Sequence, residues 1–99
     1  MVETIVLVTG GFDPIHSGHI TYFKSAKMLG DRLIVGVNSD EWLAQKKGSA
    51  FLPLNERIEI VSNLSVVDET IEFEDDESSS AANAIATVVE KYPNHKIIF

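Results

Sequence analysis

Two histidines in a glycine-rich stretch are the residues of this sequence best suited to chemistry. Residues 10–19 read Gly-Gly-Phe-Asp-Pro-Ile-His-Ser-Gly-His, with His16 and His19 three positions apart. The pattern turns helical from Ser17, so both side chains span the first helical turn and can face one point above the helix start. Each imidazole donates a hydrogen bond when protonated, or through one ring nitrogen when neutral. The pair therefore indicates a site for an anion.

The backbone around the histidines favours a phosphate. Gly10 and Gly11 leave the end of a strand without side chains, so backbone N–H groups can approach a ligand closely. Gly18 gives similar access at the helix start, where free N–H groups and the positive end of the dipole attract anions. Pro14 limits Asp13 to extended geometry. Two imidazoles, a helix start and a nearby lysine could stabilise a phosphoryl centre under attack without a covalent nucleophile.

Other interpretations of this stretch stay open. A glycine pair after a strand is common in dinucleotide-binding folds, but the three-glycine fingerprint is absent because Pro14 and His16 occupy the turn. The two histidines could be zinc ligands, although no third ligand lies within the motif. They could also be purely structural. We predict phosphate binding and no metal site built by the protein itself.

Composition narrows the possible partners. The formal net charge is −7, and about half of the acidic side chains lie between Asp68 and Glu77. We interpret this run as a solvated acidic rim; Asp75, Asp76 and Glu77 could bind a metal, but they lack the glycine and spacing of a calcium loop. No basic stripe exists for duplex nucleic acid, whereas a small phosphorylated ligand needs only a few local cations. The absence of cysteine excludes disulfides and thiol catalysis.

The sequence predicts one cytoplasmic domain over residues 1–99. No window approaches the roughly 18 apolar residues of a membrane span, so we expect no membrane partner. The N-terminus lacks the positive flank and cleavage site of a signal peptide. A chain of 99 residues without disulfides fits a reducing compartment and has a thin core.

Alternating strands and helices would position the histidines. Strands are expected at residues 4–9, 32–38, 66–73 and 95–99, and helices at 17–30, 40–46, 54–64 and 78–91. Met28 and Leu29 are expected to close the apolar side of the first helix. This alternation predicts an α/β fold with a doubly wound parallel sheet in three layers, truncated after the fourth strand. Such sheets bind ligands beyond the carboxyl ends of their strands, and the loop after the fourth strand, which would belong to that surface, is missing. We therefore expect a fragment or the ordered part of a longer protein, the alternative being that a partner subunit supplies what is absent.

Residues 9–19 resemble the His-x-Gly-His signature of the cytidylyltransferase-like nucleotidyltransferases. That family has a Rossmann-like fold and transfers a nucleoside monophosphate from a triphosphate to a phosphorylated acceptor, with release of pyrophosphate. The similarity continues to about Glu69. Residues 30–40 resemble the second strand of the sugar-phosphate branch, which includes glycerol-3-phosphate cytidylyltransferase and the nucleotidyl domain of the bifunctional heptose-phosphate enzyme. Lys46 and Lys47 match its basic segment, and residues 55–57 match its Glu-x-Arg helix.

The resemblance implies roles for individual residues. The catalytic residues would be His16 and His19, holding phosphates in the transition state, and Lys46. The residues that bind nucleotide or acceptor would be Gly10, Gly11, Phe12, Asp13, Gly18, Asp40, Lys47 and Arg57. Asp40 would lie near the acceptor or orient the lysine segment. Arg57 would pair with a carboxylate or reach the acceptor, unless it forms a surface salt bridge, and the two lysines could instead end a solvated helix.

The leading interpretation is a nucleotidyltransferase that moves CMP or AMP from CTP or ATP to a sugar or polyol phosphate, with Mg²⁺, as a homodimer. Ser65 stands where the glycerol-3-phosphate enzyme carries an arginine, which favours a heptose-like acceptor. The family's later Gly-Gly-Asp turn and Ser-Thr-Thr segment are not in the sequence, so these 99 residues alone are expected to be inactive. The alternatives are a non-catalytic nucleotide-binding or assembly module, and a pantetheine-phosphate or nicotinate adenylyltransferase.

Overall fold

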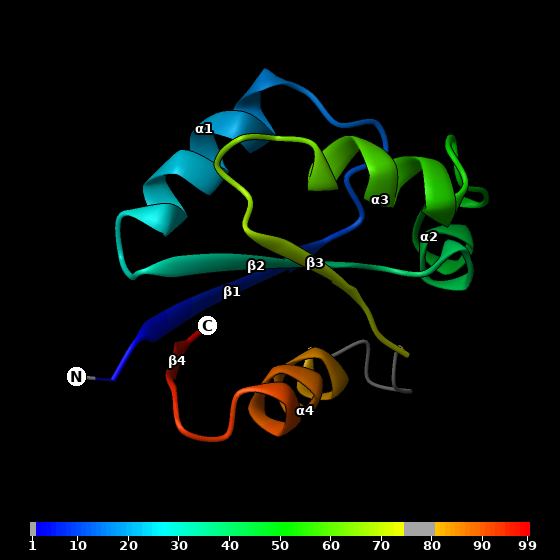
Figure 1. Cartoon of the computed structure of the whole chain (residues 1–99). Coiled ribbons are helices and arrows are strands. Elements are labelled where there is room, and N and C mark those ends of the chain that lie inside the picture. The colour runs from blue at the N-terminus through cyan, green and yellow to red at the C-terminus, as the bar shows by residue number, and fades with distance from the viewer. Residues whose placement is uncertain (1, 75–80) are drawn as a thin grey trace.

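Strands and helices alternate along the chain in the computed structural model, which describes residues 2–74 and 81–99 (Figure 1). The strands are β1 (Thr4–Gly10), β2 (Arg32–Val37), β3 (Glu69–Glu72) and β4 (Lys96–Ile98). The helices are α1 (Ser17–Lys27), α2 (Asp40–Lys47), α3 (Leu54–Ser62) and α4 (Ala82–Lys91). The predicted order of elements is confirmed.

The four strands form one parallel sheet in the order β3-β2-β1-β4. The strand order reverses beside β1, because β2 and β3 follow on one side of it and β4 lies on the other. Open α/β sheets bind ligands at such a switch, beyond the carboxyl ends of the strands. Gly10 pairs with Val37, so the turns after β1 and β2 leave the sheet at the same level. The sequence motif therefore lies at the switch point.

Helices cover both faces of the sheet, as Figure 1 shows. Val6, Val8 and Val35 pack with α1 and α3 on one face, and Leu7 and Ile34 pack with α4 on the other. Successive side chains of a strand point to opposite faces, so a strand covered on both sides is apolar throughout. The predicted three-layer, doubly wound arrangement is confirmed.

The third strand is shorter than predicted. It begins at Glu69 rather than Val66, because the chain leaves α3 in a tight turn. In that turn the Val67 N–H donates to the Leu64 carbonyl oxygen at 3.0 Å. The apolar residues before Glu69 thus belong to the turn, and the side chain of Val67 still packs in the core.

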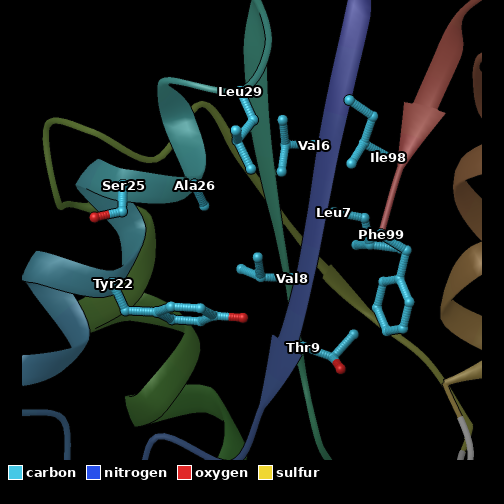
Figure 2. Close-up of a pocket in the computed structure, with 10 residues that line it drawn as sticks. All are labelled: Val6, Leu7, Val8, Thr9, Tyr22, Ser25, Ala26, Leu29, Ile98 and Phe99. Atoms are coloured by element: carbon cyan, nitrogen blue, oxygen red, sulfur yellow. The ribbon is translucent and has the colours of Figure 1, made fainter.

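The end of the first helix also differs from the prediction. Met28 and Leu29 are 86% and 63% exposed, so they do not close the apolar side of α1, which ends at Lys27. Leu29 instead lines an open pocket of about 520 Å³ between α1 and the β1–β4 edge, together with Tyr22 and Phe99 (Figure 2). None of the ten residues that line this pocket is charged, so it offers no cation to a phosphate.

Some predicted features lie outside the described residues. These are the acidic residues Asp75, Asp76 and Glu77 and the cap cluster at residues 78–80. Within the described part of the chain, α4 follows Ala81 without a side-chain cap. None of the helices found in residues 2–74 and 81–99 has the length and apolar character needed to cross a membrane.

Candidate functional site

His16 and His19 cap the N-terminus of α1 reciprocally. The Nδ1 atom of His16 accepts from the Gly18 N–H at 3.1 Å, and the Nδ1 atom of His19 accepts from the His16 N–H at 3.1 Å. This is a capping box in which two imidazoles replace the usual hydroxyl and carboxylate. A neutral imidazole that accepts at one nitrogen carries its proton on the other. Both rings are therefore fixed as Nε2–H donors.

The two imidazoles form a compact pair that rests on Phe12. Their ring centroids are 4.0 Å apart, and the Phe12 ring meets His19 edge to face at 5.2 Å. Phe12 is buried and also packs against Phe23 at 5.2 Å. Burial, and then the proximity of His16, lowers the pKa of His19. His19 is consequently neutral at pH 7 and donates through Nε2.

Three glycines of the motif make room for neighbouring side chains of the same chain. A Cβ atom on Gly18 would lie 2.8 Å from Cε1 of His16, so glycine lets that ring lie over the helix start. A Cβ atom on Gly11 would lie 2.7 Å from Cδ2 of Leu43, so glycine lets α2 approach the turn after β1. A Cβ atom on Gly10 would lie 2.8 Å from Cζ of Phe12, so all three glycines have a structural reason, and their predicted contacts with phosphate stay predictions.

Asp13 ties the turn after β1 to the loop before α3. Its side chain is fully buried and accepts from the N–H groups of Phe51 and Leu52, the latter at 2.7 Å. Lys47 Nζ lies 2.8 Å from the Asp13 carboxylate and also donates to the Asp13 carbonyl oxygen at 2.8 Å. Burial alone would raise the pKa of Asp13, but Lys47 and the two amides outweigh it and lower that pKa. Asp13 and Lys47 thus hold each other, and their predicted ligand contacts stay predictions.

Arg57 lies in the interior, so the interpretation of a surface salt bridge is wrong. The residue is 1% exposed. Its guanidinium donates to three carbonyl oxygens, those of Gly11 at 2.9 Å, Asn38 at 2.7 Å and Leu52 at 2.9 Å. It also pairs with the Asp40 carboxylate at 2.6 Å. Arg57 therefore pairs with a carboxylate, as one of the alternatives held, and it joins three segments that are distant in sequence.

Trp42 is a site residue that sequence reasoning missed. Its ring lies beside Gly11, because a Cβ atom there would be 3.4 Å from Cζ3 of Trp42. Lys46 Nζ lies 5.4 Å from the centroid of the indole, a cation–π contact. An aromatic residue four positions before a lysine on one helix was the available signal. Within the described residues, Trp42 Nε1 is buried without a hydrogen-bond partner, and Lys46 makes no ion pair.

These residues gather around the carboxyl ends of β1 and β2. The turn after β1 carries Phe12 and Asp13, α1 begins with the two histidines, α2 carries both lysines, and Arg57 reaches in from α3. His16 and His19 are hydrogen-bond donors and Lys46 is a cation, and none of the three has an anionic partner among the described residues. Such an arrangement can bind a polyanion and stabilise charge that develops on it. Among residues 2–74 and 81–99, no cluster of three His, Cys, Asp or Glu side chains could hold a metal ion.

A family model and several curated proteins are similar in sequence to this chain. Residues 7–98 match the family model described as Cytidylyltransferase-like. The chain is 43% identical over 76 residues to the Bifunctional protein HldE of Photorhabdus laumondii, and 42% identical over 76 residues to that of Escherichia coli O1:K1 / APEC. Each match covers 75% of this chain and 16% of the relative. The chain thus spans about a sixth of the length of these relatives.

Solved structures share the fold. A lipopolysaccharide core biosynthesis protein from Thermoplasma volcanium superimposes with a TM-score of 0.73 at 30% identity, over 96% of this chain and 72% of that one. A protein of unknown function from Archaeoglobus fulgidus gives a TM-score of 0.58 at 22% identity, over 94% of each chain, which shows a common fold alone.

Proposed function

The chain belongs to the cytidylyltransferase-like family, a family of nucleotidyltransferases, and we propose that it carries the phosphate-binding half of such an enzyme. The proposed reaction transfers CMP or AMP from CTP or ATP to a sugar or polyol phosphate. An oxygen of the acceptor phosphate attacks the α-phosphorus, the bond from that phosphorus to the bridging oxygen breaks, and pyrophosphate leaves with the electron pair. The acceptor class rests on the similarity of residues 30–47 to the sugar-phosphate branch.

The reciprocal histidine cap is the observation that carries this proposal. Charge accumulates on the phosphate oxygens as the α-phosphorus is attacked, and fixed donors stabilise that charge most effectively. His16 and His19 supply two Nε2–H donors whose direction the backbone sets, so little reorganisation is needed during the reaction. The Nδ1 atoms cannot serve as general bases while they accept from the backbone. We therefore assign both histidines to charge stabilisation rather than to proton transfer.

Lys46 would bring a full positive charge to the same phosphates. The indole of Trp42 holds its ammonium group by a cation–π contact that a phosphate can replace at small cost. Lys47 differs, because its ion pair with the buried Asp13 carboxylate must break before it can move. We assign the catalytic role to Lys46 and a structural role to Lys47.

We propose that Mg²⁺ reaches the site bound to the triphosphate. The carboxylates of Asp13 and Asp40 are engaged by Lys47 and Arg57. Neither belongs to a metal-binding cluster within the described residues. Mg²⁺ commonly binds through substrate phosphates with few protein ligands. The ion would then neutralise phosphate charge that the histidines and Lys46 do not reach. We further propose a homodimer in the cytoplasm, and sedimentation velocity would test its state of association.

Pyrophosphate release tests the proposed function. The full-length protein is incubated with CTP or ATP, Mg²⁺ and a panel of sugar and polyol phosphates, and the product is identified by mass spectrometry. We expect release with one triphosphate and one class of acceptor, and its loss when the acceptor is omitted. Triphosphate binding without release for every acceptor would contradict the transferase. Failure to bind any triphosphate would contradict the phosphate site as well.

A further inference from the structure

The buried guanidinium of Arg57 connects the turn after β1, the end of β2 and the loop before α3. We propose that Arg57 is a positioning residue for the triphosphate, which sets the direction of the backbone N–H groups that follow the two strands. This inference rests on the proposed function and names a residue that acts through others. Arg57 is 1% exposed, so it acts on the ligand through the peptide groups that it holds.

The geometry of the peptide bond lets Arg57 orient N–H groups by holding the carbonyl groups of the same peptides. Arg57 Nη1 donates to the carbonyl oxygens of Gly11 at 2.9 Å and Asn38 at 2.7 Å. The C=O and N–H of a planar trans peptide point in opposite directions. Holding the Gly11 carbonyl toward the interior therefore turns the Phe12 N–H away from Arg57, toward the mouth of the turn. The Asn38 carbonyl fixes the Ser39 N–H in the same way. One side chain thus orients two peptide groups at neighbouring strand ends.

Backbone strain at Phe12 makes this support necessary. Phe12 has φ = 52°, in the left-handed region that residues other than glycine seldom adopt. Such a conformation costs on the order of 1–3 kcal/mol and persists only where the surroundings determine it. The Phe12 ring is held by Phe23 and His19, and the carbonyl before it is held by Arg57. Arg57 therefore fixes the peptide group before Phe12, and the aromatic contacts fix its side chain.

The position of Arg57 also couples the turn to the helix that carries the lysines. Its fourth bond goes to Asp40, the first residue of α2, whose side chain is 46% exposed. Lys46 and Trp42 lie on the same helix. A shift of Arg57 would therefore move the phosphate turn and α2 relative to each other. Lysine keeps the charge but offers a single ammonium group in place of a planar fork, so it cannot satisfy four acceptors.

The test compares Arg57→Lys with Arg32→Lys, an arginine at the opposite end of the sheet that pairs with Glu3. Inorganic tripolyphosphate is the probe, and binding is followed by the fluorescence of Trp42, the single tryptophan, and by amide NMR signals. We expect Arg57→Lys to bind about tenfold or more weakly, because the fixed donors are lost. Its Phe12 and Ser39 amide signals should shift before ligand is added. Arg32→Lys should bind as the wild type does.

Several outcomes would overturn the proposal. One is a folded Arg57→Lys protein, shown by circular dichroism, that binds tripolyphosphate with unchanged affinity and unshifted Phe12 amide. Another applies even if that variant does not fold: tripolyphosphate binds the wild type without perturbing the Phe12 amide. Asp40→Asn keeps the three carbonyl bonds of Arg57 and should weaken binding less than threefold or so. Failure of the wild type to bind tripolyphosphate would instead contradict the proposed function.

Discussion

The two ends of the parallel sheet differ in which of their basic side chains have an acidic partner among the described residues. At the amino ends of the strands, acidic side chains meet basic ones in the pairs Lys27–Asp68, Arg32–Glu3 and Lys91–Glu69. At the carboxyl ends, Asp13 and Asp40 are bound by Lys47 and Arg57, and the described residues offer no acid to His16, His19 or Lys46. The difference separates the ion pairs that stabilise the fold from the groups that we propose bind a ligand. The ion pairs hold the strand starts in place, and the proposed site keeps its donors without acidic partners among the described residues.

The largest expected effect concerns the histidines. Replacing His16 by alanine removes one fixed donor from the charge that develops on the phosphate. We expect kcat for pyrophosphate release to fall about 100-fold or more, with about 1 kcal/mol lost from the unfolding free energy because the helix cap is lost. His95→Ala is the matched control, because His95 lies at the amino end near Glu3. Equal losses in the two variants would abolish the distinction between the two ends.

Removing one carboxylate at each end compares how much the two carboxylates contribute to the free energy of unfolding. Asp13→Asn leaves the N–H groups of Phe51 and Leu52 and the Lys47 ammonium without a charged acceptor at a buried side chain, so we expect a loss of about 2 kcal/mol. Asp68 also accepts from a backbone N–H, that of Leu33 at 2.7 Å, but its side chain is 35% exposed. Asp68→Asn should therefore cost about 1 kcal/mol or less. Urea unfolding measures both changes, and a larger loss for Asp68→Asn would contradict the contrast.

Stability should depend on pH in two steps. The upper step arises at the carboxyl end, whereas both ends contribute to the acid step, because the pKa of Asp13 is also lowered from its usual 3.8 by Lys47 and two amides against the effect of burial. The pKa of His19 is lowered below its usual 6.5, so the unfolded chain binds a proton more readily and stability is lost as the pH falls below about 6.5. The pKa values of Asp68 and Glu69 are lowered from 3.8 and 4.5, chiefly by Lys27 and Lys91 against the opposing effect of burial. Their contribution is present above pH 4.5 and is lost as the pH falls below it.

Chemical unfolding between pH 3 and 8 would resolve these steps. We expect His19→Ala to abolish the step below pH 6.5 and to leave the acid step intact. A variant that lacks His19 but keeps the upper step would show that the linkage does not arise from the histidine pair.

The smallest effect is expected for a single ion pair at the amino end. Lys27→Met removes the partner of Asp68, and pairs whose side chains are about one-third exposed contribute about 0.5 kcal/mol. We expect a small fall in the unfolding midpoint and unchanged kcat and KM, measured on the same preparation. A change in KM for the triphosphate would show that the amino end influences the site.

Local patterns in the sequence predicted the fold and the position of the histidines. Apolar runs, helix caps and a three-residue spacing are all readable from neighbouring residues. The partners of Arg57 are not, because its bonds reach carbonyl groups 46 and 19 residues away, and no pattern within α3 indicates them. For the same reason the sequence did not indicate the hydrogen bonds between Asp13 and the loop before α3, because that loop lies 38 residues further along the chain. Sequence reasoning therefore identified the residues that we propose bind phosphate more readily than the contacts that hold them in place.

The ring nitrogens of the three histidines provide the most direct test of the phosphate site. Long-range ¹H–¹⁵N NMR spectra at neutral pH distinguish Nδ1–H from Nε2–H tautomers, with and without CTP or ATP. We predict that His16 and His19 are Nε2–H tautomers, that their Nε2 signals shift when the triphosphate binds, and that the signals of His95 do not. Nδ1–H tautomers at positions 16 and 19, or a bound triphosphate that leaves both Nε2 signals unmoved, would contradict the proposed phosphate site.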